Sequence, residues 1–152
     1  MAFVPFSYAR KAILQVVTSI DEEKLDVIPP GFANSIRWNV GHLLVVADRI
    51  LRHAANYQAV VPDHYTSFFD MGTSPAQWSE EPPSLAEIVR YAEAQLEAVQ
   101  RLSDNGCDLP LAKTFDLRGT TFTTLSDLLG FLSYHEGLHL GACKLIKKHA
   151  GA

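Results

Sequence analysis

Hydrophobic residues recur at helical spacing in four separate segments of the chain. The first segment, residues 6–25, ends at the paired prolines and the glycine of "VIPPG". Its apolar positions are Ile13, Val16, Val17 and Ile20. The second segment, residues 35–57, has an apolar stripe from Ile36 to Ala54, and Asn34 or Ser35 can cap its first turn. Both segments are therefore predicted to be amphipathic helices.

The third and fourth segments begin at residues that typically cap helices. Ser84 followed by Glu87 has the pattern of a capping box, and the helix it begins is expected to end near "SDNG". Thr124 followed by Asp127 is a weaker form of the same pattern, and its helix runs to near the end of the chain. Four amphipathic helices of about 20 residues predict an all-α fold, a four-helix bundle.

Two connections between the predicted helices stand out. Residues 58–83 form a long connection, and a loop of this length in a compact domain tends to be functional, ordered over a site or across a partner. The stretch "KTFDLRGTTFT" alternates enough to allow a small extended hairpin near Arg118 and Gly119.

Composition narrows the class of protein. A chain of 152 residues with 47% hydrophobic and 20% charged residues is expected to form one globular domain, residues 1–152. A net charge of -4 gives no basic surface for nucleic acid or an anionic membrane. The chain has no signal-peptide pattern and no apolar run of about 18 residues that would span a membrane. Two cysteines form no disulfide framework, so we expect a soluble protein of the reducing cytoplasm.

The motif that points to chemistry is "HEGLH" in the fourth segment. His135 and His139 lie about 40° apart on a helix and continue the apolar row of Leu128 and Leu132. Both imidazoles should therefore face the interior, where burial is unfavourable unless they are hydrogen-bonded or share a metal. Neutral imidazole is a good ligand for zinc, nickel, copper or iron. The alternative is a pair of histidines satisfied in the core or at the surface.

The same stretch spells the H-E-x-x-H pattern of zinc peptidases, with Glu136 in the place of the general base. The metzincin continuation fails, because Ala142 and Leu145 stand where its glycine and third histidine belong. His149 lies too near the chain end to return to the pair, so a peptidase is not expected. Glu136 is kept as a candidate base or hydrogen-bond partner of the site. The alternative is a solvated or interhelical glutamate.

A metal would need a third ligand from upstream in the chain. The candidates are His42, His53, His64, Asp48 and Asp70. Periodicity alone does not select His42, because it falls off the centre of the apolar stripe of its segment.

Two stretches together resemble the DinB / YfiT-like family, whose members are regarded as metal-dependent enzymes. In "NSIRWNVGHLLVVADRIL", a tryptophan and a glycine lead to a histidine, as in the family's second helix. The stretch "LLGFLSYHEGLHLGACKLIKK" is similar to its last helix, where two histidines four residues apart precede a glycine. The order and spacing of the four helices also agree, so the resemblance covers nearly the whole chain.

The resemblance implies an up-down-down-up bundle with a long crossover, residues 58–83, between helices two and three. It implies one divalent metal on His42, His135 and His139, and the affinity of nitrogen ligands for late transition metals leads us to expect zinc or nickel. It also implies a homodimer and a thiol-dependent S-transferase or isomerase that acts on a small-molecule substrate with a low-molecular-weight thiol. Metal-dependent hydrolysis is the second expectation for the reaction. The alternative from another class is a non-catalytic metal- or ligand-binding bundle.

Overall fold

The computed structural model describes residues 2–151 and is mainly helical, with one small two-stranded sheet. The long helices are α1 (Phe3–Thr18), α2 (Ile36–Leu51), α4 (Leu85–Asp104) and α5 (Leu125–His149). The shorter elements are the helix α3 (Tyr65–Phe69), the 3-10 turns Glu22–Lys24 and Pro75–Gln77, and the strands β1 (Pro110–Leu117) and β2 (Thr120–Thr124). The predicted helical class is confirmed. Within residues 2–151, no helix combines the length and the apolar composition needed to cross a membrane.

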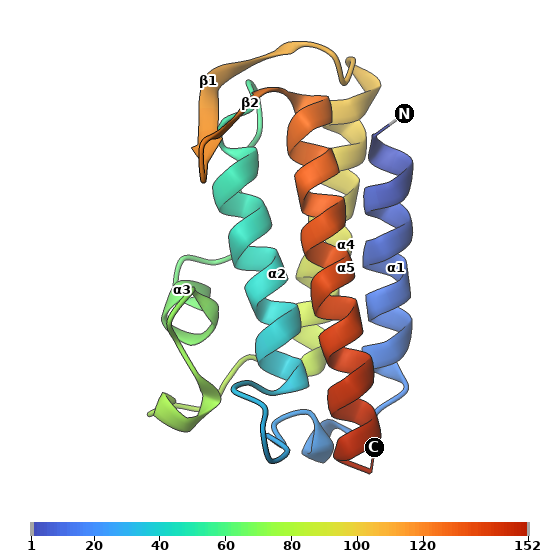
Figure 1. Ribbon diagram of the computed structural model, residues 1–152, viewed down its shortest axis with the longest axis vertical. Helices are drawn as coiled ribbons and strands as arrows, with labels where there is room; N and C mark the ends of the chain where they lie inside the picture. Colours follow the sequence, from blue (N-terminus) through green and yellow to red (C-terminus); the bar gives the residue numbers. More distant parts are fainter. Residues whose placement is uncertain (1, 152) are drawn as a thin grey trace.

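The long helices lie side by side, and α1 and α2 each pack against both α4 and α5 (Figure 1). α1 and α5 run in one direction, and α2 and α4 run in the opposite one (Figure 1). Because α2 and α4 are parallel, the chain between them must return along the length of the molecule. That connection carries α3, which packs against α2 (Figure 1).

The apolar stripes of the sequence form the interior. Ile13 and Val17 of α1, Leu44 of α2 and Leu128 of α5 are all fully buried. Burial of such a side chain stabilises the fold by roughly 1.5–3 kcal/mol. Tyr65, Phe68 and Phe69 of the crossover are buried as well, so the long connection is an ordered part of the core.

Two helices end earlier than the sequence predicted. α1 ends at Thr18 rather than near residue 25, and a separate 3-10 turn follows it. α2 ends at Leu51 rather than near residue 57. Hydrophobic residues continue at helical spacing beyond Thr18 and beyond Leu51, so the sequence pattern could not locate the end of either helix.

The caps of α4 and α5 reverse the predicted ranking. Ser84 Oγ accepts from the Glu87 backbone N–H at 3.2 Å, but the Glu87 carboxylate accepts from Tyr65 Oη at 2.9 Å instead of closing the box. At α5 the box is complete, with Asp127 Oδ2 accepting from Thr124 N at 2.9 Å and Thr124 Oγ1 accepting from Asp127 N at 3.1 Å. The weaker pattern is thus the fully formed one, because the crossover takes the Glu87 side chain.

The predicted hairpin is confirmed. β1 and β2 pair antiparallel through a turn in which Arg118 (φ 49°) and Gly119 (φ 80°) are both left-handed, as a type I′ hairpin turn requires. Phe115 and Phe122 are partners across the strands, and both rings lie against Phe131 of α5. The hairpin therefore covers α5 one turn before His135.

Candidate metal centre

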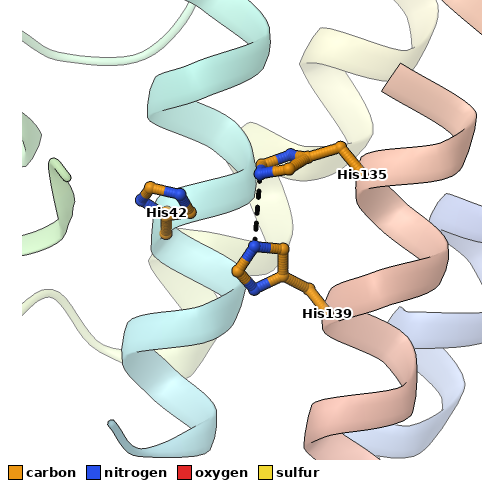
Figure 2. A group of neighbouring side chains, drawn as sticks. All are labelled: His42, His135 and His139. Atoms are coloured by element: carbon orange, nitrogen blue, oxygen red, sulfur yellow. Dashed lines mark hydrogen bonds between the residues drawn. The ribbon is translucent and has the colours of Figure 1, made fainter. Parts of the chain in front are cut away.

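Helices α2 and α5 bring three histidines together. His42 lies on α2, and His135 and His139 project toward it from successive turns of α5 (Figure 2). One nitrogen from each imidazole can be chosen so that all three lie within 4.8 Å of one another. His42 is only 7% exposed, and His135 and His139 are partly buried. The three positions that the resemblance selected thus converge in space.

The closest pair has the spacing that a shared ion requires. His135 Nε2 and His139 Nε2 lie 3.2 Å apart (Figure 2). Two nitrogens bound at about 2.0–2.1 Å to one tetrahedral ion lie about 3.3 Å apart. Three protein nitrogens also leave a coordination position open, which is typical of a catalytic rather than a structural ion. The donor set and its spacing therefore fit a divalent transition metal.

The crossover sets the orientation of His42. Its Nδ1 donates to the Phe69 carbonyl oxygen at 2.7 Å, and because a carbonyl only accepts, Nδ1 carries the proton. Its Nε2 is then left with a free lone pair. The Trp38 ring stacks on the imidazole, with centroids 4.5 Å apart and planes 13° apart. A backbone group of α3 and an aromatic face of α2 thus hold His42 in a form that can bind a metal.

The two histidines of α5 differ in their outer contacts. His139 Nδ1 lies 2.7 Å from Asn39 Oδ1 of α2. His135 Nδ1 is buried and has no hydrogen-bond partner among residues 2–151. The His135 ring is instead stacked on Phe131, with planes 13° apart. The Nδ1 atoms of His42 and His139 are therefore held by hydrogen bonds to α3 and α2, whereas His135 is held by packing on Phe131 and by the bond between its Nε2 and His139 Nε2.

Burial keeps all three imidazoles neutral. It lowers the pKa of His139 to about 3, and repulsion between protonated imidazoles, from His135 and His42, adds to the effect. It lowers the pKa of His135 to about 4, with His42 and Arg10 adding to the effect. The pKa of His42 is also lowered by burial, against the opposing effect of its bond to Phe69. Near neutral pH the group is thus in the deprotonated state that metal binding requires.

Glu136 faces a different set of partners. It is 1% exposed, and its Oε1 accepts from Arg10 Nε of α1 at 2.9 Å. Arg10 Nη1 also donates to Gln95 Oε1 of α4 at 2.9 Å, and Gln95 Nε2 donates to Asp48 Oδ1 of α2 at 2.6 Å. Within residues 2–151, no hydrogen bond joins Glu136 to one of the three imidazoles. Glu136 is an interhelical glutamate in a buried network that links all four long helices.

The other upstream ligand candidates have different partners. Asp48 accepts from the backbone of the crossover as well as from Gln95. Asp70 forms an ion pair with Arg49. His53 Nδ1 lies 3.1 Å from the Lys113 carbonyl oxygen near the hairpin. The His64 ring packs edge-on against Tyr65. The structure places none of these four side chains in the three-histidine group.

Sequence reasoning missed two groups that hold the imidazoles, Asn39 and the Phe69 carbonyl. The signal for Asn39 was an amide in the apolar stretch "RWNVGHLL", one turn before His42, because a buried amide needs partners. The Phe69 carbonyl had no signal, because any residue offers the same backbone oxygen.

Fold and site together define a mainly helical protein with a candidate three-histidine metal centre. The sequence pattern of the DinB superfamily matches residues 6–143, a range that includes all three histidines. The chain therefore belongs to the DinB superfamily, and the family expected from the two motifs is confirmed. A comparison with curated proteins found no match.

Proposed function

We propose that this protein is a divalent-metal-dependent enzyme whose metal is held by Nε2 of His42, His135 and His139. The observation that carries the proposal is the convergence of three neutral imidazoles, two of them with their Nε2 atoms 3.2 Å apart. An all-nitrogen donor set suits zinc or nickel, and we propose one of these as the metal.

The chemistry we propose is thiol-dependent S-transfer or isomerisation, with hydrolysis as the second choice. A divalent ion on three neutral ligands has an open position, where it lowers the pKa of a thiol or of water. The chain itself supplies orientation, through the Phe69 carbonyl and Asn39. His135 and His139 are less buried than His42, which supports access by a small substrate and a low-molecular-weight thiol from the α5 side.

A non-catalytic metal-binding protein is the alternative, and one observation favours it. Glu136, the candidate catalytic base, is bound to Arg10 inside the protein. Only Oε1 of Glu136 contacts Arg10, but protonation of the carboxylate would remove the countercharge of the buried Arg10, and an uncompensated buried charge typically costs about 3–5 kcal/mol. In the enzyme proposal, Glu136 remains the candidate base through its Oε2, which has no hydrogen-bond partner among residues 2–151.

We also propose that the long helices form an up-down-down-up four-helix bundle, which is supported by their packing pairs and directions. A homodimer follows from the family resemblance and is supported by exposed apolar side chains on α5. These side chains are Tyr134, Leu138 and Leu145. A cytoplasmic location is proposed from the two free cysteines.

A conjugation assay tests the enzyme proposal. Untagged protein is loaded with zinc or nickel and incubated with an aromatic halide and a panel of small thiols, and in a parallel reaction with an ester and no thiol. We expect thiol-dependent turnover that a chelator abolishes and that His135→Ala lacks. Thiol-independent ester cleavage with the same metal dependence would favour the hydrolase. One bound metal per chain without turnover of either substrate would favour the binding protein instead.

A further inference from the structure

A buried asparagine of α2 connects the start of that helix to a candidate ligand on α5. Asn39 is 4% exposed. Its Oδ1 lies 2.7 Å from His139 Nδ1, and its Nδ2 donates to the Ser35 carbonyl oxygen at 2.7 Å. Burial of a primary amide is unfavourable unless its polar atoms find partners. Both ends of this amide are therefore used.

The Ser35 carbonyl fixes which way the amide faces. A carbonyl only accepts, so the atom of Asn39 beside it must be the NH₂ group, and the oxygen must face His139. Ser35 is the N-cap of α2, where its Oγ accepts from Trp38 N at 3.2 Å. The same Ser35 carbonyl accepts from the Asn39 backbone N–H at 3.1 Å. The orientation of the Asn39 amide is therefore fixed by the backbone of α2 rather than by a mobile side chain.

An amide oxygen also only accepts, so His139 Nδ1 must carry its proton. The lone pair of His139 is then on Nε2, the atom that lies 3.2 Å from His135 Nε2. We propose that Asn39 is a positioning residue that holds His139 in its Nδ1–H tautomer and directs Nε2 toward the metal centre. The metal part of this inference rests on the proposed function, whereas the tautomer is a property of the metal-free protein.

Two substitutions of Asn39 distinguish the role of its hydrogen-bond acceptor from the role of its side-chain volume. Asn39→Leu keeps a similar volume and removes the acceptor. Asn39→Asp keeps an acceptor for His139 and loses the donor to Ser35. Val40→Ala serves as the control for a general loss of stability, because Val40 is the neighbouring residue on the same helix, is 1% exposed and carries no hydrogen-bonding side chain.

The first readout is the nitrogen NMR spectrum of the metal-free proteins above pH 7, which distinguishes a protonated from an unprotonated ring nitrogen. We expect His139 to be protonated at Nδ1 in wild-type, Asn39→Asp and Val40→Ala protein. In Asn39→Leu the proton should be shared between the two nitrogens or move to Nε2. A merely structural role of Asn39 would leave the tautomer unchanged in all variants.

The second readout is zinc affinity by competition with a chelating dye. We expect Asn39→Leu to bind zinc about 10–100-fold more weakly, as is typical when the partner of a ligand histidine is lost. Asn39→Asp should stay within a few fold of wild type, and Val40→Ala should be unchanged.

An unaltered tautomer in Asn39→Leu, or protonated Nε2 in wild-type protein, would overturn the inference whether or not metal binds. If the tautomer shifts as expected and zinc affinity does not change, the metal role of Asn39 is overturned. If wild-type protein binds no divalent metal, the proposed function fails and the metal role of Asn39 fails with it. The tautomer result stands in that case.

Discussion

Replacement of Gly41 by alanine should destabilise the protein, although alanine is the better helix former. Gly41 lies on α2 directly before His42, and the ring of Phe69 from α3 packs over it. A Cβ built on Gly41 would lie 2.5 Å from both Cδ1 and Cδ2 of Phe69, closer than real Cβ contacts allow. Phe69 is fully buried, and Tyr65, Phe68 and Trp78 surround its ring with centroids 5.5–5.8 Å away. The ring therefore has little room to move aside.

The expected change in the free energy of unfolding results from two opposing effects. Alanine in a helix interior gains roughly 0.5–1 kcal/mol over glycine. Overpacking of a tight core typically costs about 1–3 kcal/mol. A backbone shift of α3 would also move the Phe69 carbonyl, which accepts from His42 at 2.7 Å. We expect a net loss of about 1–2 kcal/mol, a fall in melting temperature of roughly 2–8 °C and about tenfold weaker zinc binding.

Gly130→Ala is the matched control, because a Cβ at Gly130 of α5 meets nothing within 4 Å. The control should be more stable than wild type by roughly 0.5–1 kcal/mol, with unchanged zinc affinity. Urea unfolding and chelator competition measure both quantities. Phe69→Leu in the Gly41→Ala background should recover part of the loss, so the two changes should not be additive. A Gly41→Ala protein as stable as Gly130→Ala would refute the close packing of α3 on α2.

Three further predictions concern charge, pH and metal. Glu136→Gln should lower the free energy of unfolding, measured in urea, by about 3–5 kcal/mol, because it leaves Arg10 charged and buried. A change in activity at unaltered stability would instead identify Glu136 as a base. The metal-free protein should lose stability as the pH falls from about 6.5 toward 4. Unfolded histidines bind protons in this range, whereas burial lowers the pKa of His135 to about 4 and that of His139 to about 3 in the folded protein. His139→Ala should therefore weaken the pH dependence, and an equally steep profile would contradict the assignment. Zinc at 100 times its dissociation constant should raise stability by about 2.7 kcal/mol, and a chelator should reverse the gain; an unchanged melting temperature would argue against binding to the folded state.

The helices and the histidine pair of α5 could be predicted because both depend on local periodicity. His135 and His139 continue the row of Leu128 and Leu132, so their inward direction follows from the 3.6-residue repeat alone. The turn at Gly119 was similarly visible, because the residues of a tight hairpin turn are set by local backbone angles.

The third histidine and the buried network depend on contacts between distant parts of the chain. His42 is off the apolar stripe and is buried because α3 covers it, which no pattern within α2 reveals. Arg10 meets Glu136 across 126 positions of sequence and Gln95 across 85. A single sequence shows a charged residue on an apolar face but does not say which partner compensates it. His42 was predicted as a ligand from the family resemblance, because residue spacing alone did not select it.

The metal content of untagged protein, measured by elemental analysis after purification without added metal, tests the central claim most directly. Wild-type protein should contain about one zinc or nickel ion per chain. His42→Ala and His139→Ala, which remove ligands from different helices, should each lose most of it. His53→Ala removes a histidine outside the group and should keep the wild-type content. The same metal content in all four proteins, or no metal in the wild type, would contradict a shared ion among the three imidazoles.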